Sequence, residues 1–235
     1  AVEDGAEVIV FSAIDYERNA ASIDEAAKAG VGIVSIDSGV GSDQVSTYIG
    51  TDNYAAGRMA AQAALMEVEG PLQVGIVNYN EGTANGQERV RGAMVTAVVT
   101  TLVDAPRAQT DTVGLLLDHP EINVLMAFNE PTSVGAARAV RTLDRAEQIF
   151  LVGFDSNIVT IDGLQDGYVD ALIVQNPYAM GYLGVESAYK LLSEQSGGLE
   201  PMLDTATQIV NRENFFTIDG QKALFAFDPY SNWAK

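Results

Sequence analysis

Polar side chains that carry carboxylates or amides follow several of the apolar runs in this chain. Asp37 comes directly after residues 31–36, and Asp155 comes directly after residues 149–154. The residues at such positions are Ser12, Asp37, Asn78, Asn129, Asp155 and Gln175. Carboxylates and amides form bidentate hydrogen bonds with hydroxyl groups on adjacent carbons, so neutral polyols are suitable ligands for them. Each residue alone also suits a helix cap. Together they predict a ring of hydrogen-bonding groups rather than a catalytic centre.

Motifs for nucleotide binding and nucleophilic catalysis are missing from the sequence. It contains no glycine-rich phosphate loop and no Gly-x-Ser-x-Gly elbow. The single histidine, His119, stands before Pro120 where a helix is expected to end, and a cap or surface role is predicted for it. Pairs of Asp and Glu leave a glycosidase open, because a sequence does not give the separation of two carboxylates. We predict that the protein is not an enzyme.

The composition limits the class of protein and its partners. A chain of 235 residues with 47% hydrophobic residues can form one large domain or two lobes. Its 13 Lys and Arg against 32 Asp and Glu give a net charge of −19, which repels phosphate backbones and anionic lipids. No apolar run reaches the roughly 18 residues that would span a membrane. We therefore expect no nucleic-acid partner and no membrane insertion of this chain.

The sequence contains no cysteine, which excludes disulfides, a thiol nucleophile and thiolate metal sites. This leaves the redox compartment open, so cytosol and periplasm are both compatible with the composition. We expect neither a metal nor a cofactor.

Short apolar runs alternate with helical patterns along most of the chain, as in βαβ units around parallel sheets. Strands are expected at 7–12, 31–36, 73–78, 124–128, 149–154 and 171–174. Helices are expected at 17–29, 54–67, 85–97, 107–118, 131–143, 158–166 and 178–194. The predicted fold class is α/β.

Two segments fit this pattern less simply. The helix at 85–97 runs into an apparent strand at 98–104 with no turn between them, so either residues are absent there or the helix is very short. We favour absent residues. After Asn211 the alternation and the pair Asp219–Gly220 predict a late strand with a turn, followed by a tail.

On these motifs the chain resembles the periplasmic sugar-binding proteins of bacterial ABC importers, in the ribose-binding group of the type I fold. The resemblance covers nearly the whole chain and follows the family's order. It rests on residues 2–10, 36–39, 50–58, 87–92, 118–122, 127–130, 152–155 and 174–177.

The resemblance implies two Rossmann-like lobes with parallel sheets, joined by a three-strand hinge. The N-terminal lobe would comprise 1–51 and 176–205, and the C-terminal lobe 52–175 and 206–235. It also implies that the opening βαβ unit of the N-terminal lobe is missing.

The same resemblance assigns roles to the polar residues. Asp37 falls on the family's carboxylate for the sugar hydroxyls, and Asn129, Asp155 and Gln175 fall on its Asn, Asp and Gln contacts. Ser12 falls on a strand-end polar position near the sugar.

Ser38 and Gln87 stand at ligand-contact positions where ribose binders carry arginine. Ribose contacts of the usual kind are therefore in question. Arg89 could reach the crevice instead, although its spacing places it on the surface.

Aromatic side chains that stack on a sugar face are also expected from the resemblance. The candidates are Tyr16, Tyr79, Phe128 and Tyr178, with Phe128 expected in the core.

The resemblance implies a monomeric receptor that captures a pentose-like monosaccharide or polyol between its lobes and delivers it to an ABC transporter permease. It would be periplasmic or extracellular, with a lipid anchor left open. Two alternatives share the architecture: the sugar-sensing effector domain of a LacI-type transcription regulator, which needs a helix-turn-helix, and a receptor for a furanosyl autoinducer.

Overall fold

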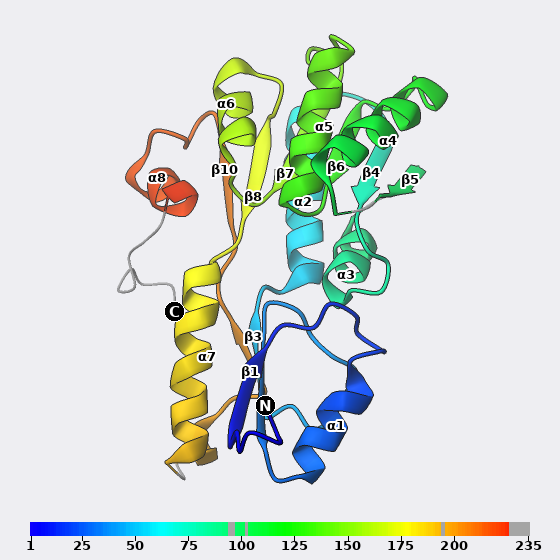
Figure 1. The fold of residues 1–235 in the computed structure, drawn as a ribbon. Helices are drawn as coiled ribbons and strands as arrows, with labels where there is room; N and C mark the ends of the chain where they lie inside the picture. Colours follow the sequence, from blue (N-terminus) through cyan, green and yellow to red (C-terminus); the bar gives the residue numbers. More distant parts are fainter. Residues whose placement is uncertain (94–96, 102, 194–195, 226–235) are drawn as a thin grey trace.

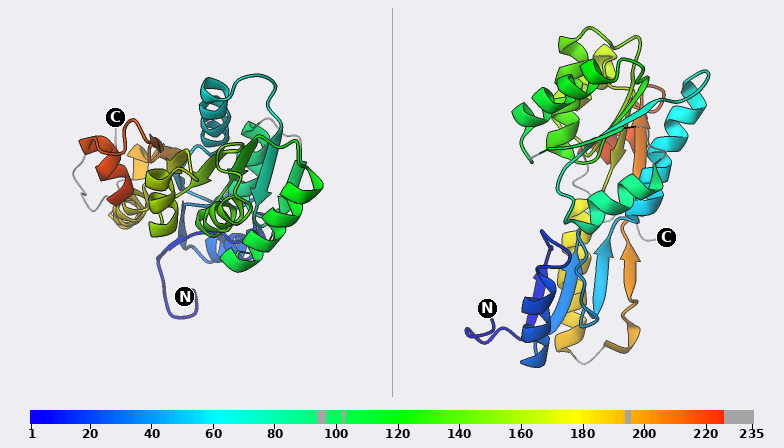
Figure 2. Two further views of the ribbon diagram at one scale, coloured as in Figure 1. Left: turned by 90° about the horizontal axis from the view of Figure 1, so that it is seen from above. Right: turned by 90° about the vertical axis from the view of Figure 1, so that its right-hand side faces the viewer.

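The computed structural model describes residues 1–93, 97–101, 103–193 and 196–225, and it divides their strands between two sheets (Figure 1). The two sheets lie one above the other, each with helices packed against it (Figure 2). The prediction of an α/β fold with two parallel sheets is confirmed.

The smaller sheet is parallel throughout. Its strands, in spatial order, are β1 (Val8–Phe11), β2 (Gly32–Ile36), β3 (Thr47–Gly50) and β9 (Met202–Asp204). Helix α1 (Ala20–Lys28) packs on β2, and α7 (Pro177–Leu192) packs on β1, β2 and β3. Gly184 of α7 permits this packing, because a Cβ there would lie 2.9 Å from Ile36.

The larger sheet is parallel except for one antiparallel edge strand, β10. Its strands, in spatial order, are β10 (Gln208–Asn211), β8 (Ala171–Val174), β7 (Phe150–Phe154), β6 (Val124–Ala127), β4 (Val74–Asn78) and β5 (Ala97–Thr100). The other helices are α2 (Asn53–Glu67), α3 (Ala84–Gly92), α4 (Ala105–Asp118), α5 (Glu130–Thr142), α6 (Ile158–Asp166), α8 (Ile218–Phe225) and the short η1 (Ser196–Gly198).

Both faces of the larger sheet are buried because helices cover each of them. Successive strand residues point to opposite faces, so Ile76 joins one core cluster and Val77 joins the other. The Ile76 cluster contains Ala56 and Ala60 of α2, and the Val77 cluster contains Ala137 of α5. This double coverage explains why β4, β6 and β8 are continuous buried apolar runs rather than alternating ones.

The chain passes between the two sheets three times: from β3 to α2, from β8 to α7 and from β9 to β10. A hydrogen-bond chain links these crossings. The Thr207 hydroxyl donates to the Thr51 hydroxyl at 3.4 Å, and Thr51 donates to Gln175 Oε1 at 3.0 Å. Ala206, in the third crossing, has a left-handed backbone with φ of 49°. That conformation is strained for a residue with a Cβ.

The prediction of a late strand after Asn211 is wrong, because residues 218–225 form α8. Gly220 lies in the first turn of this helix rather than in a hairpin turn. A Cβ at Gly220 would lie 2.2 Å from the Asn214 carbonyl oxygen, so glycine is needed for this close contact. The strands β3, β9 and β10, which have four, three and four residues, were not predicted.

The predicted helix 85–97 and strand 98–104 were both too long, since α3 ends at Gly92 and β5 covers Ala97–Thr100. Residues 94–96 lie outside the described residues. The junction at 97–98, where residues were expected to be absent, lies within β5, and their absence stays a prediction. His119 ends α4, as expected, and its Nδ1 lies 3.1 Å from Glu121 Oε1.

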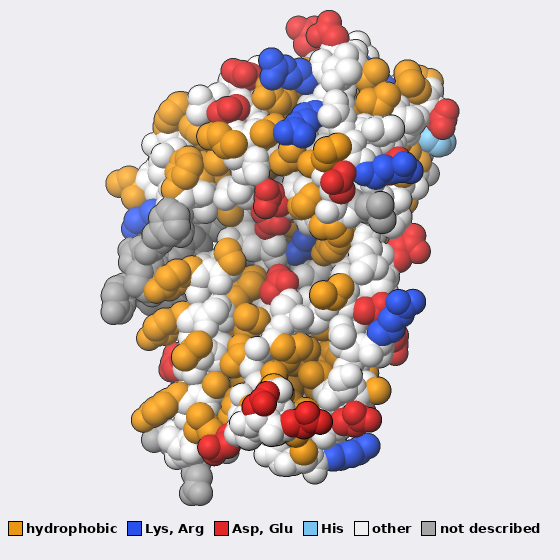
Figure 3. Space-filling model, in the orientation of Figure 1, with side chains coloured by type: hydrophobic (Ala, Val, Ile, Leu, Met, Phe, Trp, Pro, Cys, Tyr) orange, Lys and Arg blue, Asp and Glu red, His pale blue; other side chains and the backbone are white. Residues whose placement is uncertain are grey.

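Helix α7 carries a row of exposed apolar side chains along the outer side of the molecule (Figure 3). They are Tyr178, Tyr182, Val185, Tyr189 and Leu192, each between 43% and 68% exposed. Their spacing of four and three residues places them on one face of the helix.

Among the described residues, no helix combines the length and apolar character needed to cross a membrane.

Candidate ligand-binding site

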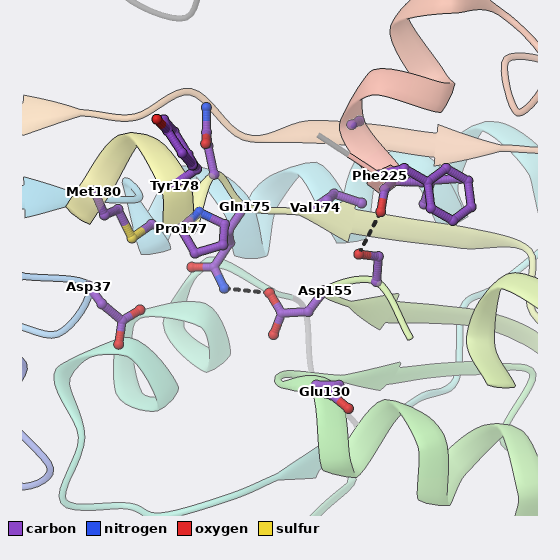
Figure 4. A pocket seen from close by; sticks show the side chains of 13 residues that line it. Asp37, Glu130, Asp155, Val174, Gln175, Pro177, Tyr178, Met180 and Phe225 are labelled. Atoms are coloured by element: carbon purple, nitrogen blue, oxygen red, sulfur yellow. Dashed lines mark hydrogen bonds between the residues drawn. The ribbon is translucent and has the colours of Figure 1, made fainter. Parts of the chain in front are cut away.

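A cavity of about 490 Å³ lies between the two sheets, next to the second crossing (Figure 4). Asp37 enters it from the smaller sheet, and Asp155 and Gln175 enter it from the larger sheet. The described residues that line it are Asp37, Glu130, Asp155, Ser156, Val174, Gln175, Asn176, Pro177, Tyr178, Met180, Ala223, Leu224 and Phe225.

Asp37 occupies the turn that follows β2, where its backbone is left-handed with φ of 61°. Its N–H donates to the Ile49 carbonyl oxygen at 2.9 Å, which keeps the residue bonded to the neighbouring strand. The Tyr48 hydroxyl donates to the Asp37 carbonyl oxygen at 2.7 Å. The Ser12 hydroxyl donates to Asp37 Oδ2 at 3.1 Å. These contacts direct the carboxylate toward the cavity.

Asp155 occupies the matching turn after β7, with φ of 63°. Its N–H donates to the Ile173 carbonyl oxygen at 2.9 Å, as Asp37 does to its neighbouring strand. Gln175 Nε2 donates to Asp155 Oδ1 at 2.6 Å. Burial raises the pKa of the Asp155 carboxyl, and the Arg89 charge and the Gln175 hydrogen bond oppose this rise.

Arg89 of α3 lies behind these residues and is only 1% exposed. Its Nε donates to Asn53 Oδ1 at 2.8 Å, and its Nη2 donates to Gln175 Oε1 at 2.7 Å. Nη1 donates to the Phe128 carbonyl oxygen, and Cζ lies 4.4 Å from the centre of the Phe154 ring. The guanidinium is thus paired with protein atoms on several sides, as a buried charge requires.

Among the described residues that line the cavity, three carry carboxylates, Asp37, Glu130 and Asp155, and none is Lys, Arg or His. Glu130 Oε1 accepts a hydrogen bond of 2.6 Å from Asn157 Nδ2. The described residues contain no group of three or more His, Cys, Asp or Glu that could hold a metal ion. The cavity therefore offers hydrogen-bond acceptors and an amide to a ligand rich in hydroxyl groups.

The structure brings together Asp37, Asp155 and Gln175 of the predicted site, with Ser12 bonded to Asp37. Asn129 caps α5, with its Oδ1 accepting from the Thr132 N–H at 3.0 Å.

Two further predicted site residues lie outside the cavity lining. Ser38 is buried behind Asp37 at 4% exposure. Gln87 is exposed on α3, and its Nε2 donates to the Glu81 carbonyl oxygen at 2.6 Å.

The expectation that Arg89 lies on the surface is wrong, because the side chain is buried. Its hydrogen-bond acceptors come from three other segments of the chain, and the spacing of residues within α3 does not reveal them. Of the predicted aromatic walls, Tyr178 lines the cavity, whereas Tyr79 and Phe128 are buried in the core.

Tyr16 lies outside the cavity, with its ring over Gly41. Glu130 and Phe225 line the cavity and were not predicted. Glu130 follows Asn129 directly, so its place after a strand was the signal available for it.

A periplasmic binding protein domain model matches residues 1–196 of the chain. The chain is 25% identical over 202 residues to the ribose import binding protein RbsB of Bacillus subtilis, and 26% identical over 207 residues to the D-ribose/D-allose-binding protein of Pseudomonas aeruginosa. These matches cover 81% and 82% of this chain and 65% of each relative. The chain therefore spans slightly less than two thirds of these relatives.

Solved structures of the same kind match the fold. An ABC transporter solute-binding protein of Agrobacterium vitis with bound D-fucose is 26% identical, with a TM-score of 0.88 over 96% of this chain and 81% of its own. A carbohydrate transporter solute-binding protein of Agrobacterium radiobacter in complex with D-arabinose is also 26% identical, with a TM-score of 0.85 over 93% and 78%. The chain belongs to the periplasmic binding protein domain family, a family of non-enzymatic solute-binding proteins with the type I fold.

Proposed function

We propose that this protein is an extracytoplasmic receptor that captures a monosaccharide or polyol of pentose-like size between its two sheets. The observation that carries the proposal is the placement of Asp37, Asp155 and Gln175 around one cavity, with contributions from both sheets. A planar carboxylate accepts hydrogen bonds from two hydroxyls on adjacent carbons, and the Gln175 amide can donate to a third oxygen. A ligand that lacks one of these hydroxyls would leave a buried acceptor unpaired.

The size and charge of the cavity agree with a small neutral ligand. A volume of about 490 Å³ lies within the ordinary range for small-molecule sites. The lining carboxylates of Asp37, Glu130 and Asp155 repel a phosphate or carboxylate on the ligand. The relatives named for ribose and allose, and the similar structures with D-arabinose and D-fucose, support a monosaccharide.

In this proposal Asp37, Asp155 and Gln175 contact the sugar directly. Ser12 and Asn129 complete the proposed contact set from the strand ends beside them. Tyr178 supplies an aromatic wall, since it lines the cavity and is 43% exposed. Contacts by Ser38 and Gln87 stay predictions.

Closure around the ligand would be a hinge motion at the three crossings. We place these hinges at Thr51–Asp52, Gln175–Asn176 and Thr205–Ala206, which gives lobes of 1–51 with 176–205 and of 52–175 with 206–235. Because Gln175 belongs both to a crossing and to the cavity, a ligand that binds Gln175 acts directly on the hinge.

The proposed partner is the permease of an ABC importer, reached by a monomeric receptor in the periplasm or on the cell surface. The net charge of −19 favours docking on basic permease loops. We expect the rate of transport to fall as salt screens this attraction. A transport rate that does not change with ionic strength would contradict electrostatic attraction between the receptor and the permease.

The test is isothermal titration calorimetry of the chain with D-ribose, D-arabinose, D-allose and D-fucose, with Asp155→Ala as the control variant. We expect one sugar to bind the wild type with 1:1 stoichiometry and to lose most of its affinity for the variant. The same sugar should be recovered unchanged, and aryl glycosides should not be hydrolysed. Absence of binding by all four sugars, or turnover of a glycoside, would count against the proposal.

A further inference from the structure

Gln175 has an amide that can lie in either of two orientations, and its neighbours distinguish them. Its Oε1 accepts from Arg89 Nη2 at 2.7 Å and from the Thr51 hydroxyl at 3.0 Å. Its Nε2 donates to Asp155 Oδ1 at 2.6 Å. In the reversed orientation the NH2 group would face the guanidinium, which only donates, and the oxygen would face a carboxylate. A hydroxyl such as that of Thr51 can turn to accept, so two contacts exclude reversal: the one with Arg89, which only donates, and the one with the Asp155 carboxylate, which only accepts.

Arg89 fixes a second amide in the same way. Its Nε donates to Asn53 Oδ1 at 2.8 Å, so the Asn53 NH2 group faces away from it. That NH2 group donates to Asn85 Oδ1 at 3.1 Å, and Asn85 Nδ2 donates to the Asp37 carbonyl oxygen at 3.2 Å. Directed hydrogen bonds therefore connect Arg89 with the turns that carry both cavity aspartates.

Close helix packing holds the Arg89 backbone in place. A Cβ at Gly57 of α2 would lie 2.2 Å from the Arg89 carbonyl oxygen, so α2 and α3 touch through their backbones. The guanidinium lies over the Phe154 ring, directly before Asp155 in the chain. Because the charge is 1% exposed and its nitrogens donate to protein acceptors, it is not available to a ligand.

We propose that Arg89 is a positioning residue of the cavity: together with the Asp155 carboxylate it holds the Gln175 amide in one orientation, and thereby sets which atoms of Gln175 and Asp155 face a ligand. The role of that orientation in sugar binding rests on the proposed function, but the orientation itself exists without a ligand. A single ammonium group could keep the charge but not the planar fork that holds three acceptors from different segments.

The charge of Arg89 provides a readout that structural support alone would not affect. Burial raises the pKa of Asp155, and groups from four segments also act on it: Arg89 of α3 and Gln175 after β8 lower the pKa, Asp37 after β2 raises it, and the backbone at Glu130 of α5 lowers it. Removing Arg89 leaves burial and Asp37 unopposed by a cation, so the pKa of Asp155 should rise.

The experiment is NMR on the unliganded chain 1–235, wild type and the variants Arg89→Met and Arg89→Lys. The Asp155 carboxyl carbon is titrated with pH, and the order of the Gln175 side-chain NH2 group is measured by nitrogen relaxation. In Arg89→Met we expect the Asp155 pKa to rise and the NH2 group to lose order. In Arg89→Lys the retained charge should give a smaller rise, with the same loss of order.

Arg141→Met is the matched control, because Arg141 also lies over an aromatic ring of the larger lobe, 5.5 Å from the centre of Tyr168. It should leave both Asp155 and Gln175 unchanged. If Arg89→Met does not fold, Arg89→Lys gives the decision, because it keeps the charge and removes the planar fork, so the Gln175 NH2 group should lose order.

The proposal is overturned if the Gln175 side chain is as ordered in Arg89→Lys as in wild type. It is also overturned if the Asp155 pKa rises in neither of the Arg89 variants that fold. Titration of the same samples with D-arabinose separates the two hypotheses. If wild type binds none of the sugars tested above, the proposed function fails, whereas the NMR result still decides the role of Arg89.

Discussion

The turns that carry Asp37 and Asp155 have the same backbone design and different surroundings. Each follows a parallel strand, each is left-handed with φ near 60°, and each N–H donates to the neighbouring strand. Asp37 has a serine hydroxyl beside its carboxylate, whereas Asp155 has the Gln175 amide and, behind it, the buried charge of Arg89. The same backbone conformation therefore presents a carboxylate in each turn, and the surrounding side chains give the two carboxylates different chemical environments.

The strain in these turns agrees with a functional role. A left-handed backbone is unfavourable for aspartate, although short polar side chains tolerate it better than others. Such conformations persist where the surrounding structure fixes them, and they gather at functional sites. In both turns the strain aims a carboxylate at the same cavity.

The largest expected difference between the two turns is in ligand affinity. Asp155→Ala should weaken sugar binding by about 10- to 150-fold, because loss of a buried charged acceptor costs about 1.5–3 kcal/mol. Asp37→Ala should weaken it less, by about tenfold, the low end of the same range for a charged acceptor. Calorimetry of both variants, with circular dichroism as the folding control, measures this. Equal losses would mean that the two carboxylates have equivalent roles.

The pH dependence of binding should come from Asp155. Its pKa is raised by burial, so its carboxylate becomes protonated at a higher pH than an ordinary aspartate. Protonation removes an acceptor, and affinity should therefore fall as the pH drops through this raised pKa, by at most about tenfold for each pH unit below it. Asp155→Asn should abolish this dependence and Asp37→Asn should keep it. The reverse result would assign the titration to the other turn.

Asp170 offers a comparison with a titrating acid outside the cavity. Burial raises its pKa to about 6, although its Oδ2 accepts from the Leu151 N–H at 2.8 Å. An acid with a raised folded-state pKa binds more protons in the folded state than in the unfolded state, so its contribution to stability is lost as the pH rises from about 4 to about 6. Asp170→Asn cannot lose protons in this range. The free energy of unfolding of the variant minus that of wild type should therefore be higher at pH 7 than at pH 4, by roughly 1–3 kcal/mol.

Urea denaturation at the two pH values measures the effect of Asp170→Asn, and sugar affinity should not change in this variant. A change in affinity would show that titration in the larger lobe affects the cavity indirectly, and it would weaken the assignment of the pH dependence to Asp155.

Ala206 should give the smallest effect, since it has the same left-handed backbone but no polar side chain. Ala206→Gly should stabilise the fold by at most about 1 kcal/mol, because it removes the contact between Cβ and the backbone but adds freedom to the unfolded chain. Asp37→Gly removes the same strain and should also lose sugar affinity. Denaturation and calorimetry on both variants separate strain from function, and equal affinities would contradict that separation.

Two of the three cavity carboxylates, those of Asp37 and Asp155, could be predicted from sequence because each directly follows a buried apolar run, at the carboxyl end of a parallel strand. Asp37 and Asp155 needed only the alternation of strands and helices. Gln175 could be predicted for the same reason, since it directly follows the apolar run 171–174.

Arg89 could not be placed in this way. Its burial depends on Asn53, Phe128 and Gln175, which lie 36, 39 and 86 residues away in sequence. No local spacing within α3 reports contacts of this range. The helix α8 was missed because Gly220, which reads as a turn signal, is required there by close contact with Asn214.

The exposed row on α7, from Tyr178 to Leu192, has a consequence for how this protein behaves in solution. Apolar faces of this kind promote self-adhesion, and at neutral pH the net charge of −19 keeps molecules apart. This repulsion vanishes near the isoelectric point of about 4.1. Acidification therefore removes colloidal protection, and precipitation will accompany a low-pH titration unless the protein is dilute.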